Sequence, residues 1–148
     1  MKPEFMPLLA TLLFVKHFLA DGLLQTQYQL NSKRIFLHLG GLSHAATHAG
    51  LTAACFVACI WLQQYPGQSK MLALGLVAKL CTIEFCLHYL IDWTKCAFDT
   101  ARGWSENRIS ESGQRQLVIK NDLFFHAFLA DQMMHSLTYV LLLWMAFP

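Results

Sequence analysis

The sequence predicts an all-α integral membrane protein in which four transmembrane helices form an up-down bundle. Hydrophobic residues make up 55% of the 148 residues and charged residues only 14%, which is too apolar for an ordinary soluble domain. Four apolar segments, separated by polar or turn-forming stretches, each reach or exceed the roughly 20 residues that cross a bilayer. No linker divides the chain, so we expect a single membrane domain over residues 1–148.

The first two helices are expected at about 7–28 and about 35–62, on either side of the polar stretch 29–34. Lys2 before an apolar run resembles a signal peptide, but no small-residue cleavage site follows, so we assign the run to the helix. The second segment is rich in Gly, Ala, Ser and Thr, small residues that let helix backbones approach closely in a membrane. Tyr65-Pro66-Gly67 then predicts a turn.

The third helix is expected at about 70–98 and the last at about 122–147, where Trp144 is placed as an interface anchor. The connection between them, about 99–121, holds much of the charge together with scattered Gly and Ser. This composition fits either a flexible cytoplasmic loop or a partner-binding element.

The distribution of basic residues predicts how the bundle is oriented. In an up-down bundle the first and third connections lie on one side of the membrane. With their flanks they hold seven basic residues, whereas the other side has only Lys2 and Lys70; the seven are Lys33, Arg34, Lys95, Arg102, Arg108, Arg115 and Lys120. The positive-inside rule therefore predicts a multi-pass protein of the cytoplasmic membrane with both termini outside.

Each apolar segment carries one pair of metal-capable side chains four residues apart, which places both members on one helical face. The pairs are His17/Asp21, His44/His48, His88/Asp92 and Asp131/His135. In the predicted topology all four pairs fall at a similar depth, in the cytoplasmic half of the bundle. Ionisable groups are costly in a membrane and face inward, so we expect one convergent site, as in bundles that hold metals.

The residue types in these pairs indicate a divalent metal, with zinc as the first choice and iron or manganese as alternatives. Eight candidate ligands exceed the three to six protein ligands that one ion usually takes, so we expect one or two ions. Some of the Asp residues would instead orient the histidines that bind the metal.

Three further residues extend these stripes along their helices. Glu84 stands one turn before His88 and is the candidate general base, since burial would raise its pKa toward the working pH. Gln25 lies one turn after Asp21, and Lys95 lies three residues after Asp92, near the aqueous face. We assign Gln25 to the surroundings of the site, and Lys95 to catalysis through a contact with the substrate.

Other interpretations of the same residues stay open. Interhelical His–Asp hydrogen bonds without metal are the main rival, heme between histidines is another, and a proton or ion path is a third. His38 and His126 have no partner four residues away and are assigned to helix–helix hydrogen bonds. Lys16 and Lys79 are assigned to packing, and the five cysteines to small buried apolar positions, although Cys55 and Cys59 share a face that could suit a soft metal.

The chain resembles the small polytopic membrane proteins grouped as domain-of-unknown-function family 3307, found in bacteria and their phages. The resemblance covers nearly the whole chain and rests on four ordered motifs. They read His17-x3-Asp21-x3-Gln25, the central His44 and His48, His88-x2-Ile91-Asp92-x2-Lys95, and Asp131-Gln132-x2-His135. Gly22 stands where the family commonly has Phe. The resemblance implies a bacterial or phage-encoded membrane protein without an established reaction, and it adds Gln132 beside the site.

A weaker likeness to membrane-bound metal-dependent hydrolases, including the ceramidase-like superfamily, suggests a reaction. The first hypothesis is a metal-dependent hydrolase acting on a lipid or lipid-linked substrate near the cytoplasmic leaflet, where basic connections attract anionic head groups. The second is a non-enzymatic membrane protein that a metal stabilises, within an oligomer, a pore or a complex with a host protein. The third is an ion transporter. We expect lipids and a homo-oligomer as partners, and no nucleic acid.

Overall fold

The computed structural model of the chain describes residues 3–62, 70–109 and 115–147, and these residues form a helical bundle with one small hairpin. The all-α prediction is confirmed, since three long apolar helices and a C-terminal helix pack together. The helical elements are η1 (Pro3–Phe5), α1 (Met6–Leu19), η2 (Ala20–Leu24), α2 (Gln27–Ser32), α3 (Leu39–Leu62), α4 (Lys70–Ala101) and α5 (Leu123–Ala146).

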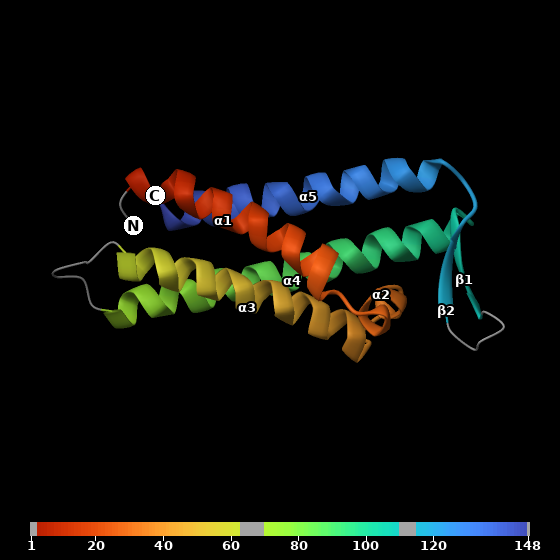
Figure 1. Ribbon diagram of the computed structural model, residues 1–148, viewed down its shortest axis with the longest axis horizontal. Coiled ribbons are helices and arrows are strands. Elements are labelled where there is room, and N and C mark those ends of the chain that lie inside the picture. The colour runs from red at the N-terminus through yellow and green to blue at the C-terminus, as the bar shows by residue number, and fades with distance from the viewer. Residues whose placement is uncertain (1–2, 63–69, 110–114, 148) are drawn as a thin grey trace.

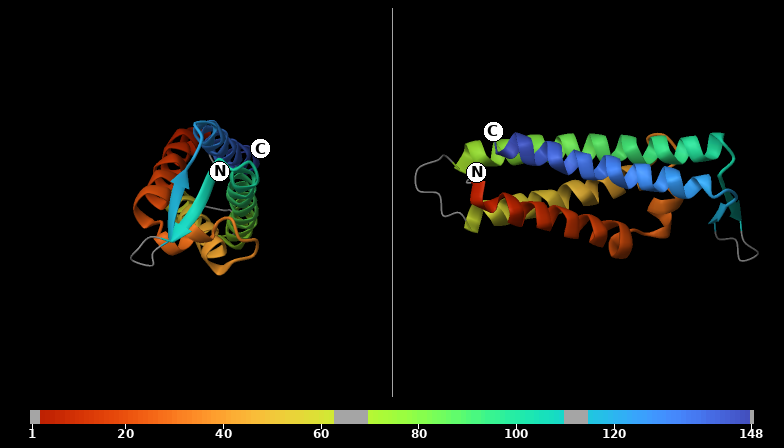
Figure 2. Two further views of the ribbon diagram at one scale, coloured as in Figure 1. Left: turned by 90° about the vertical axis from the view of Figure 1, so that its right-hand side faces the viewer. Right: turned by 90° about the horizontal axis from the view of Figure 1, so that it is seen from above.

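The four long helices form an elongated ring in which each one contacts two others. α3 packs against α4, α4 against α5, α5 against α1 and α1 against α3. Successive long helices run in opposite directions, so that the two ends of the chain lie at one end of the bundle and α2 with the hairpin at the other (Figures 1 and 2). We call these the terminal end and the hairpin end.

The first helix breaks where the sequence predicted a continuous helix over about 7–28. The backbone widens into a π-helical turn at Ala20–Leu24 and becomes extended at Gln25, with φ −72° and ψ 120°. Thr26 then begins α2 with a capping box, in which its side chain accepts from the Gln29 backbone N–H and the Gln29 side chain accepts from the Thr26 N–H. π-helical turns occur often at functional sites, and this one carries Asp21.

The second long helix begins at Leu39, later than the expected residue 35, because the chain first turns at Leu37. Leu37 has a φ of +56°, a left-handed conformation that is uncommon for a bulky side chain. Its backbone N–H donates a 2.5 Å hydrogen bond to the Tyr89 hydroxyl of α4. Tertiary contact with α4 therefore holds a turn that local sequence does not favour.

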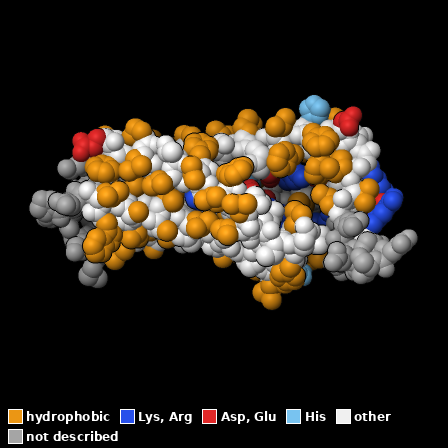
Figure 3. All heavy atoms as spheres, viewed as in Figure 1, with side chains coloured by type: hydrophobic (Ala, Val, Ile, Leu, Met, Phe, Trp, Pro, Cys, Tyr) orange, Lys and Arg blue, Asp and Glu red, His pale blue; other side chains and the backbone are white. Residues whose placement is uncertain are grey.

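The interior of the bundle is divided along its length. Toward the terminal end, buried apolar side chains from all four long helices form the hydrophobic core, with Leu9 and Leu13 from α1, Phe56 from α3, Leu80 from α4 and Leu142 from α5. Toward the hairpin end, the buried interior positions hold histidines and aspartates instead. Hydrophobic side chains are spread over the face of the bundle shown in Figure 3. Large exposed hydrophobic residues include Phe18, Leu23, Trp61 and Trp144.

Three helical segments are long and apolar enough to cross a membrane, which suggests a multi-pass membrane protein. They are Pro3–Leu24, Leu39–Leu62 and Ala73–Ala101. α5 is not among these three, because Asp131, Gln132 and His135 interrupt its apolar sequence. The predicted turn at Tyr65-Pro66-Gly67 and the basic residue Lys2 lie outside the described residues, as does the side chain of Lys70.

The connection between α4 and α5 contains an antiparallel hairpin of β1 (Ser105–Ile109) and β2 (Arg115–Ile119). Ser105 pairs with Ile119 in its register, and the Lys120 N–H donates a 2.8 Å hydrogen bond to the Trp104 carbonyl beyond the strands. The Glu106 carboxylate pairs with Arg108 and Lys120. The hairpin contacts both α2 and α4 and so lies across the end of the bundle (Figure 2).

Gly40 offers a test of the packing between α2 and α3. A Cβ atom at Gly40 would lie 2.6 Å from the Ser32 Oγ atom and 3.0 Å from the Tyr28 carbonyl oxygen. Gly40→Ala should therefore lower the free energy of unfolding by about 1–3 kcal/mol, measured by denaturation of the purified protein in detergent micelles. Gly50→Ala on the same helix is the control, since no atom lies within 4 Å of its Cβ position. Equal unfolding midpoints for the two variants would contradict this packing.

Candidate metal centre

The four pairs of metal-capable side chains converge on the interior of the bundle at its hairpin half. Neighbouring imidazole rings lie within contact distance from one helix to the next. The centroids are 5.1 Å apart for His17 and His48, 3.7 Å for His48 and His88, and 4.2 Å for His88 and His135. These rings come from α1, α3, α4 and α5. The structure therefore brings all four long helices to one histidine cluster.

Two overlapping groups within this cluster have a geometry that could hold a metal ion. One group comprises Asp21, His44, His48 and His88, and the other comprises His88, Asp92 and His135. The candidate ligand atoms within each group lie within 4.8 Å of one another. Because His88 belongs to both groups, the arrangement suits either one ion or two neighbouring ions.

Asp21 connects the first helical segment to α3. Its Oδ1 atom lies 3.0 Å from the Nε2 atom of His44 and 3.3 Å from that of His48. The π-helical turn carries this carboxylate, and its side chain remains 26% exposed. The first carboxylate of the cluster is therefore accessible from one side, although its histidine partners are buried.

Asp92 connects α4 to the other elements. Its Oδ2 atom lies 3.4 Å from the Nε2 atom of His88 and 3.5 Å from that of His44, and its Oδ1 atom lies 3.6 Å from the Nε2 atom of His135. These separations are longer than ordinary hydrogen bonds. They are spacings that a cation bound between the groups would tolerate.

His17 and Asp131 adjoin the two groups without belonging to them. Both ring nitrogens of His17 have partners, since Nδ1 lies 2.8 Å from the Tyr139 hydroxyl and Nε2 lies 3.2 Å from both the Gln132 Oε1 and the Asp21 Oδ2 atoms. Asp131 lies 3.6 Å from His135. The structure thus places His17 and Asp131 beside the ligand groups.

The two glutamines expected beside the site lie there. The Gln132 amide donates a 3.2 Å hydrogen bond to Asp131 Oδ2 while its oxygen faces His17. The Gln25 Nε2 atom lies 3.3 Å from the ring nitrogens of His44. Such polar neighbours set the orientation and basicity of metal-binding imidazoles.

The donor set and its unpaired atoms fit a divalent cation. Imidazole nitrogen and carboxylate oxygen suit zinc, iron or manganese. Within the described part of the chain, four buried polar atoms of the cluster lack a hydrogen-bond partner, namely His48 Nδ1, His88 Nε2, His135 Nε2 and Asp131 Oδ1. Buried polar atoms are normally satisfied, and an ion bound at the second group would supply a partner to His88 Nε2 and His135 Nε2.

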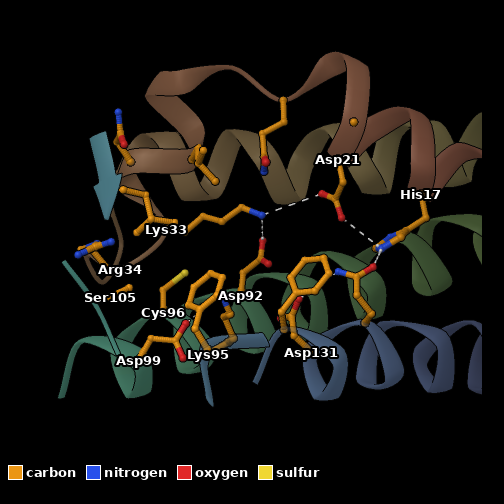
Figure 4. A pocket seen from close by; sticks show the side chains of 18 of the residues that line it. His17, Asp21, Lys33, Arg34, Asp92, Lys95, Cys96, Asp99, Ser105 and Asp131 are labelled. Carbon is orange, nitrogen blue, oxygen red and sulfur yellow. Dashed lines mark hydrogen bonds and ion pairs between the residues drawn. The ribbon is translucent and has the colours of Figure 1, made fainter. Parts of the chain in front are cut away.

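Lys33 lies at the site, although from the sequence it counts only among the basic residues that predict orientation. Its buried Nζ atom lies 3.0 Å from Asp92 Oδ2 and 4.0 Å from Asp21 Oδ1, and so links the two carboxylates (Figure 4). Burial would lower the pKa of the Lys33 ammonium, but the charges of Asp92 and Asp21 outweigh burial and raise that pKa above its ordinary value. Lys33 therefore carries its positive charge into the site.

A cavity of about 600 Å³ opens beside the cluster. Asp21, Asp92 and Asp131 line one part of it, and the basic residues Lys33, Arg34 and Lys95 also line it (Figure 4). Ser105 and Leu117 of the hairpin contribute to its wall. Charged side chains are visible within a hollow of the surface (Figure 3). The candidate ligands thus border a space large enough for part of a small molecule.

The two residues expected to be catalytic lie in different environments. Glu84 is fully buried and forms an ion pair with Lys16, which the sequence had assigned to packing. The Lys16 ammonium also donates a 3.2 Å hydrogen bond to the His48 carbonyl oxygen. This pairing favours a structural role for Glu84. Lys95 lines the cavity, and its Nζ atom lies 2.9 Å from Asp99 Oδ2 and 3.9 Å from the centre of the Phe124 ring.

The remaining histidines and the cysteines lie apart from the ligand groups. The His38 Nδ1 atom accepts a 3.1 Å hydrogen bond from the Gly40 N–H, and His126 is exposed. All five cysteines are free thiols, and the groups that could hold a metal among the described residues contain none of them. Cys59 is buried as expected, whereas Cys86 is exposed because α4 turns it toward the outside of the bundle.

Comparisons with known proteins identify a family but no function. A family model described as "Protein of unknown function (DUF3307)" matches residues 9–147. No curated protein and no solved structure matches the chain. The likeness to membrane-bound metal-dependent hydrolases therefore gains no support from these comparisons.

Substitution of the shared ligand tests whether the cluster binds metal. His88→Ala should remove most of the bound metal, because His88 belongs to both candidate groups. If two ions bind, the nearly isosteric changes Asp21→Asn and Asp92→Asn should each remove about half of the bound metal. Elemental analysis of the purified protein measures the metal content. The control is His126→Ala, which changes an exposed histidine outside the cluster. Unchanged metal content in all three site variants, or no metal in the wild type, would contradict the metal site and favour interhelical His–Asp hydrogen bonds without metal.

The buried Lys16–Glu84 pair makes a separate prediction about stability. Glu84→Gln leaves the Lys16 ammonium buried beside a neutral partner and should destabilise the fold by about 3–5 kcal/mol. Replacing both residues together, by Lys16→Met and Glu84→Leu, should recover most of this loss. Unfolding in detergent micelles measures both variants. A Glu84→Gln protein of normal stability would instead favour the general-base role for Glu84.

Proposed function

Because the chain belongs to the family described as protein of unknown function DUF3307, which assigns no reaction, we propose its function from the site itself. We propose an integral membrane protein that binds one or two divalent metal ions, with zinc as the first choice. With them it hydrolyses a lipid or lipid-linked substrate near the cytoplasmic leaflet.

The proposed orientation follows from the charges at the hairpin end. Lys33, Arg34, Arg102, Arg108 and Lys120 all belong to this end, and basic connections are retained in the cytoplasm. The metal cluster would then lie in the cytoplasmic half of the membrane, and both termini would lie outside. The large exposed hydrophobic side chains around the bundle support lipid contact on its outer surface.

The observation that carries the enzymatic proposal is the cavity of about 600 Å³ next to the ligand groups. Structural metal sites are closed by protein ligands, whereas catalytic sites keep a position open to water or substrate. Asp21 is 26% exposed and lines the cavity, so a molecule in the cavity can approach the first ligand group. This supports a reactive centre over a metal that only joins helices.

In this proposal one set of residues would hold the metal and another would attract the substrate. A bound divalent ion lowers the pKa of a water molecule and polarises an ester, amide or phosphoryl group. Asp21, His44, His48, His88, Asp92 and His135 would hold the ions. Gln132 and Tyr139 would hold the imidazole of His17 in place. Lys33, Arg34 and Lys95 would attract an anionic group of the substrate into the cavity.

A non-enzymatic role is the second candidate, and the density of contacts between helices favours it. Asp21 joins the first segment to α3, and Asp92 joins α4 to α3 and α5. A metal at these groups would lock the bundle, alone or within an oligomer that forms a pore or binds a host protein. Ion transport is disfavoured, because the described core toward the terminal end is closed by Leu9, Leu13, Phe56 and Leu142.

Turnover with a panel of lipids tests the enzymatic proposal. The purified full-length protein, loaded in turn with zinc, manganese and iron, is incubated with anionic and zwitterionic phospholipids and a lipid-linked sugar phosphate. We expect a metal-dependent product, detected by mass spectrometry, from at least one anionic lipid. Asp92→Asn should reduce turnover by more than about 100-fold. This loss is larger than the one typical of a residue that only hydrogen-bonds to a metal ligand.

His126→Ala is the control and should keep full turnover. Metal-loaded protein that converts none of these lipids would contradict the enzymatic proposal and favour the metal-stabilised bundle.

A further inference from the structure

A second hollow lies between α4 and α5, next to the cavity already described. It is a groove of about 380 Å³. Leu90 and Phe98 of α4 and Ala130 and Met134 of α5 are among the side chains that line it. Leu90, Phe98 and Met134 are exposed hydrophobic residues, and Ala130 is also exposed. The groove thus belongs to the outer apolar surface of the bundle.

The groove and the cavity share two lining residues. Lys95 and Asp131 line both hollows, so they form the partition between the outer surface and the interior. The Asp131 side chain lies close to His135 and Gln132 of the metal cluster. The Lys95 side chain is 14% exposed and lies over the Phe124 ring. A molecule in the groove would therefore have its polar end beside Lys95 and one residue away from the candidate ligand His135.

Lys95 and Asp131 are the charged side chains of a groove whose lining is otherwise almost entirely apolar. Phe98 and Lys95 lie toward the hairpin end of α4, whereas Leu90 lies further toward the middle of the bundle. The distance from Lys95 to Leu90 along the helix is about 7.5 Å. Part of an extended apolar chain fits this track, with the charged head of the molecule at Lys95. Lys33 and Arg34, which line the cavity beyond the partition, complement an anionic head group.

We propose that the α4–α5 groove binds one acyl chain of an anionic lipid, whose head group lies at Lys95 and extends into the cavity toward Lys33. This inference rests on the proposed function for the membrane orientation and for the role of the cavity. It adds that the substrate reaches the metal centre sideways from the bilayer, between α4 and α5. The ligand class is a phosphate-bearing amphiphile.

Filling the groove tests this inference by lipid binding. Ala130→Phe places a large ring in the groove, and Ala78→Phe places the same ring on an exposed part of α4 outside it. The full-length protein in mild detergent is titrated with phosphatidic acid, and bound lipid is counted by native mass spectrometry. Ala130→Phe should weaken binding by about tenfold or more, and Ala78→Phe should bind like the wild type.

Lipids with different head groups test whether the head group lies at Lys95. Phosphatidylcholine should bind the wild type more weakly than phosphatidic acid does. Lys95→Gln should reduce that difference while chain binding persists, because a charge-assisted contact to the phosphate is lost. Glycerol 3-phosphate, a head group without chains, should not displace the bound lipid at equal concentration.

Equal lipid binding by Ala130→Phe and Ala78→Phe, with unchanged metal content showing that both are folded, would overturn the inference. So would equal affinity of the wild type for both phospholipids. Failure of the proposed function is distinguishable, because lipid binding at the groove without turnover contradicts the enzyme and leaves the groove site standing. If the wild type turns over lipid but Ala130→Phe does not weaken phosphatidic acid binding, only the groove site is contradicted.

Discussion

The contacts of Asp92 are the constraint on which the arrangement of the bundle depends. This carboxylate is buried among groups from three other elements, which are Lys33 before α3, His44 on α3 and His135 on α5. An isolated carboxylate in a bundle interior costs several kcal/mol, so the fold is stable only when these partners surround it. The same requirement sets the positions of α3, α4 and α5 relative to one another at the hairpin half.

The division of the interior into a polar half and an apolar half links stability to function. Leu9, Leu13, Phe56 and Leu142 pack the terminal half, so the polar half can hold a cavity without loss of the whole fold. The Lys16–Glu84 pair contacts the His48 carbonyl and so adjoins the histidine cluster. A rigid core would thereby hold the backbone of the candidate ligands in place, as preorganised sites require.

The hairpin end relates the site to its surroundings. Ser105 and Leu117 of the hairpin line the cavity at the end of the bundle, and the groove between α4 and α5 adjoins the same cavity through Lys95 and Asp131. The cavity therefore has basic residues toward the hairpin end and a lateral apolar side. A centre that acts on amphiphilic molecules would need both a polar and an apolar side. The proposal of metal-dependent lipid hydrolysis can therefore be tested on this protein.

The residue pattern is enough to predict the all-α class, the long apolar helices and the identity of the clustered residues, because helical spacing of four and burial of ionisable groups are local, periodic properties. Tyr139 could also have been found, since it extends the Asp131/His135 stripe by one turn. The capping box of Thr26 and Gln29 is a local signal for the break after Leu24. The turn at Leu37, the Lys16–Glu84 pair and the place of Lys33 between Asp21 and Asp92 follow only from the packed bundle. Each of these depends on contacts between residues far apart in the chain, and a pattern within one segment carries no information about a partner on another helix.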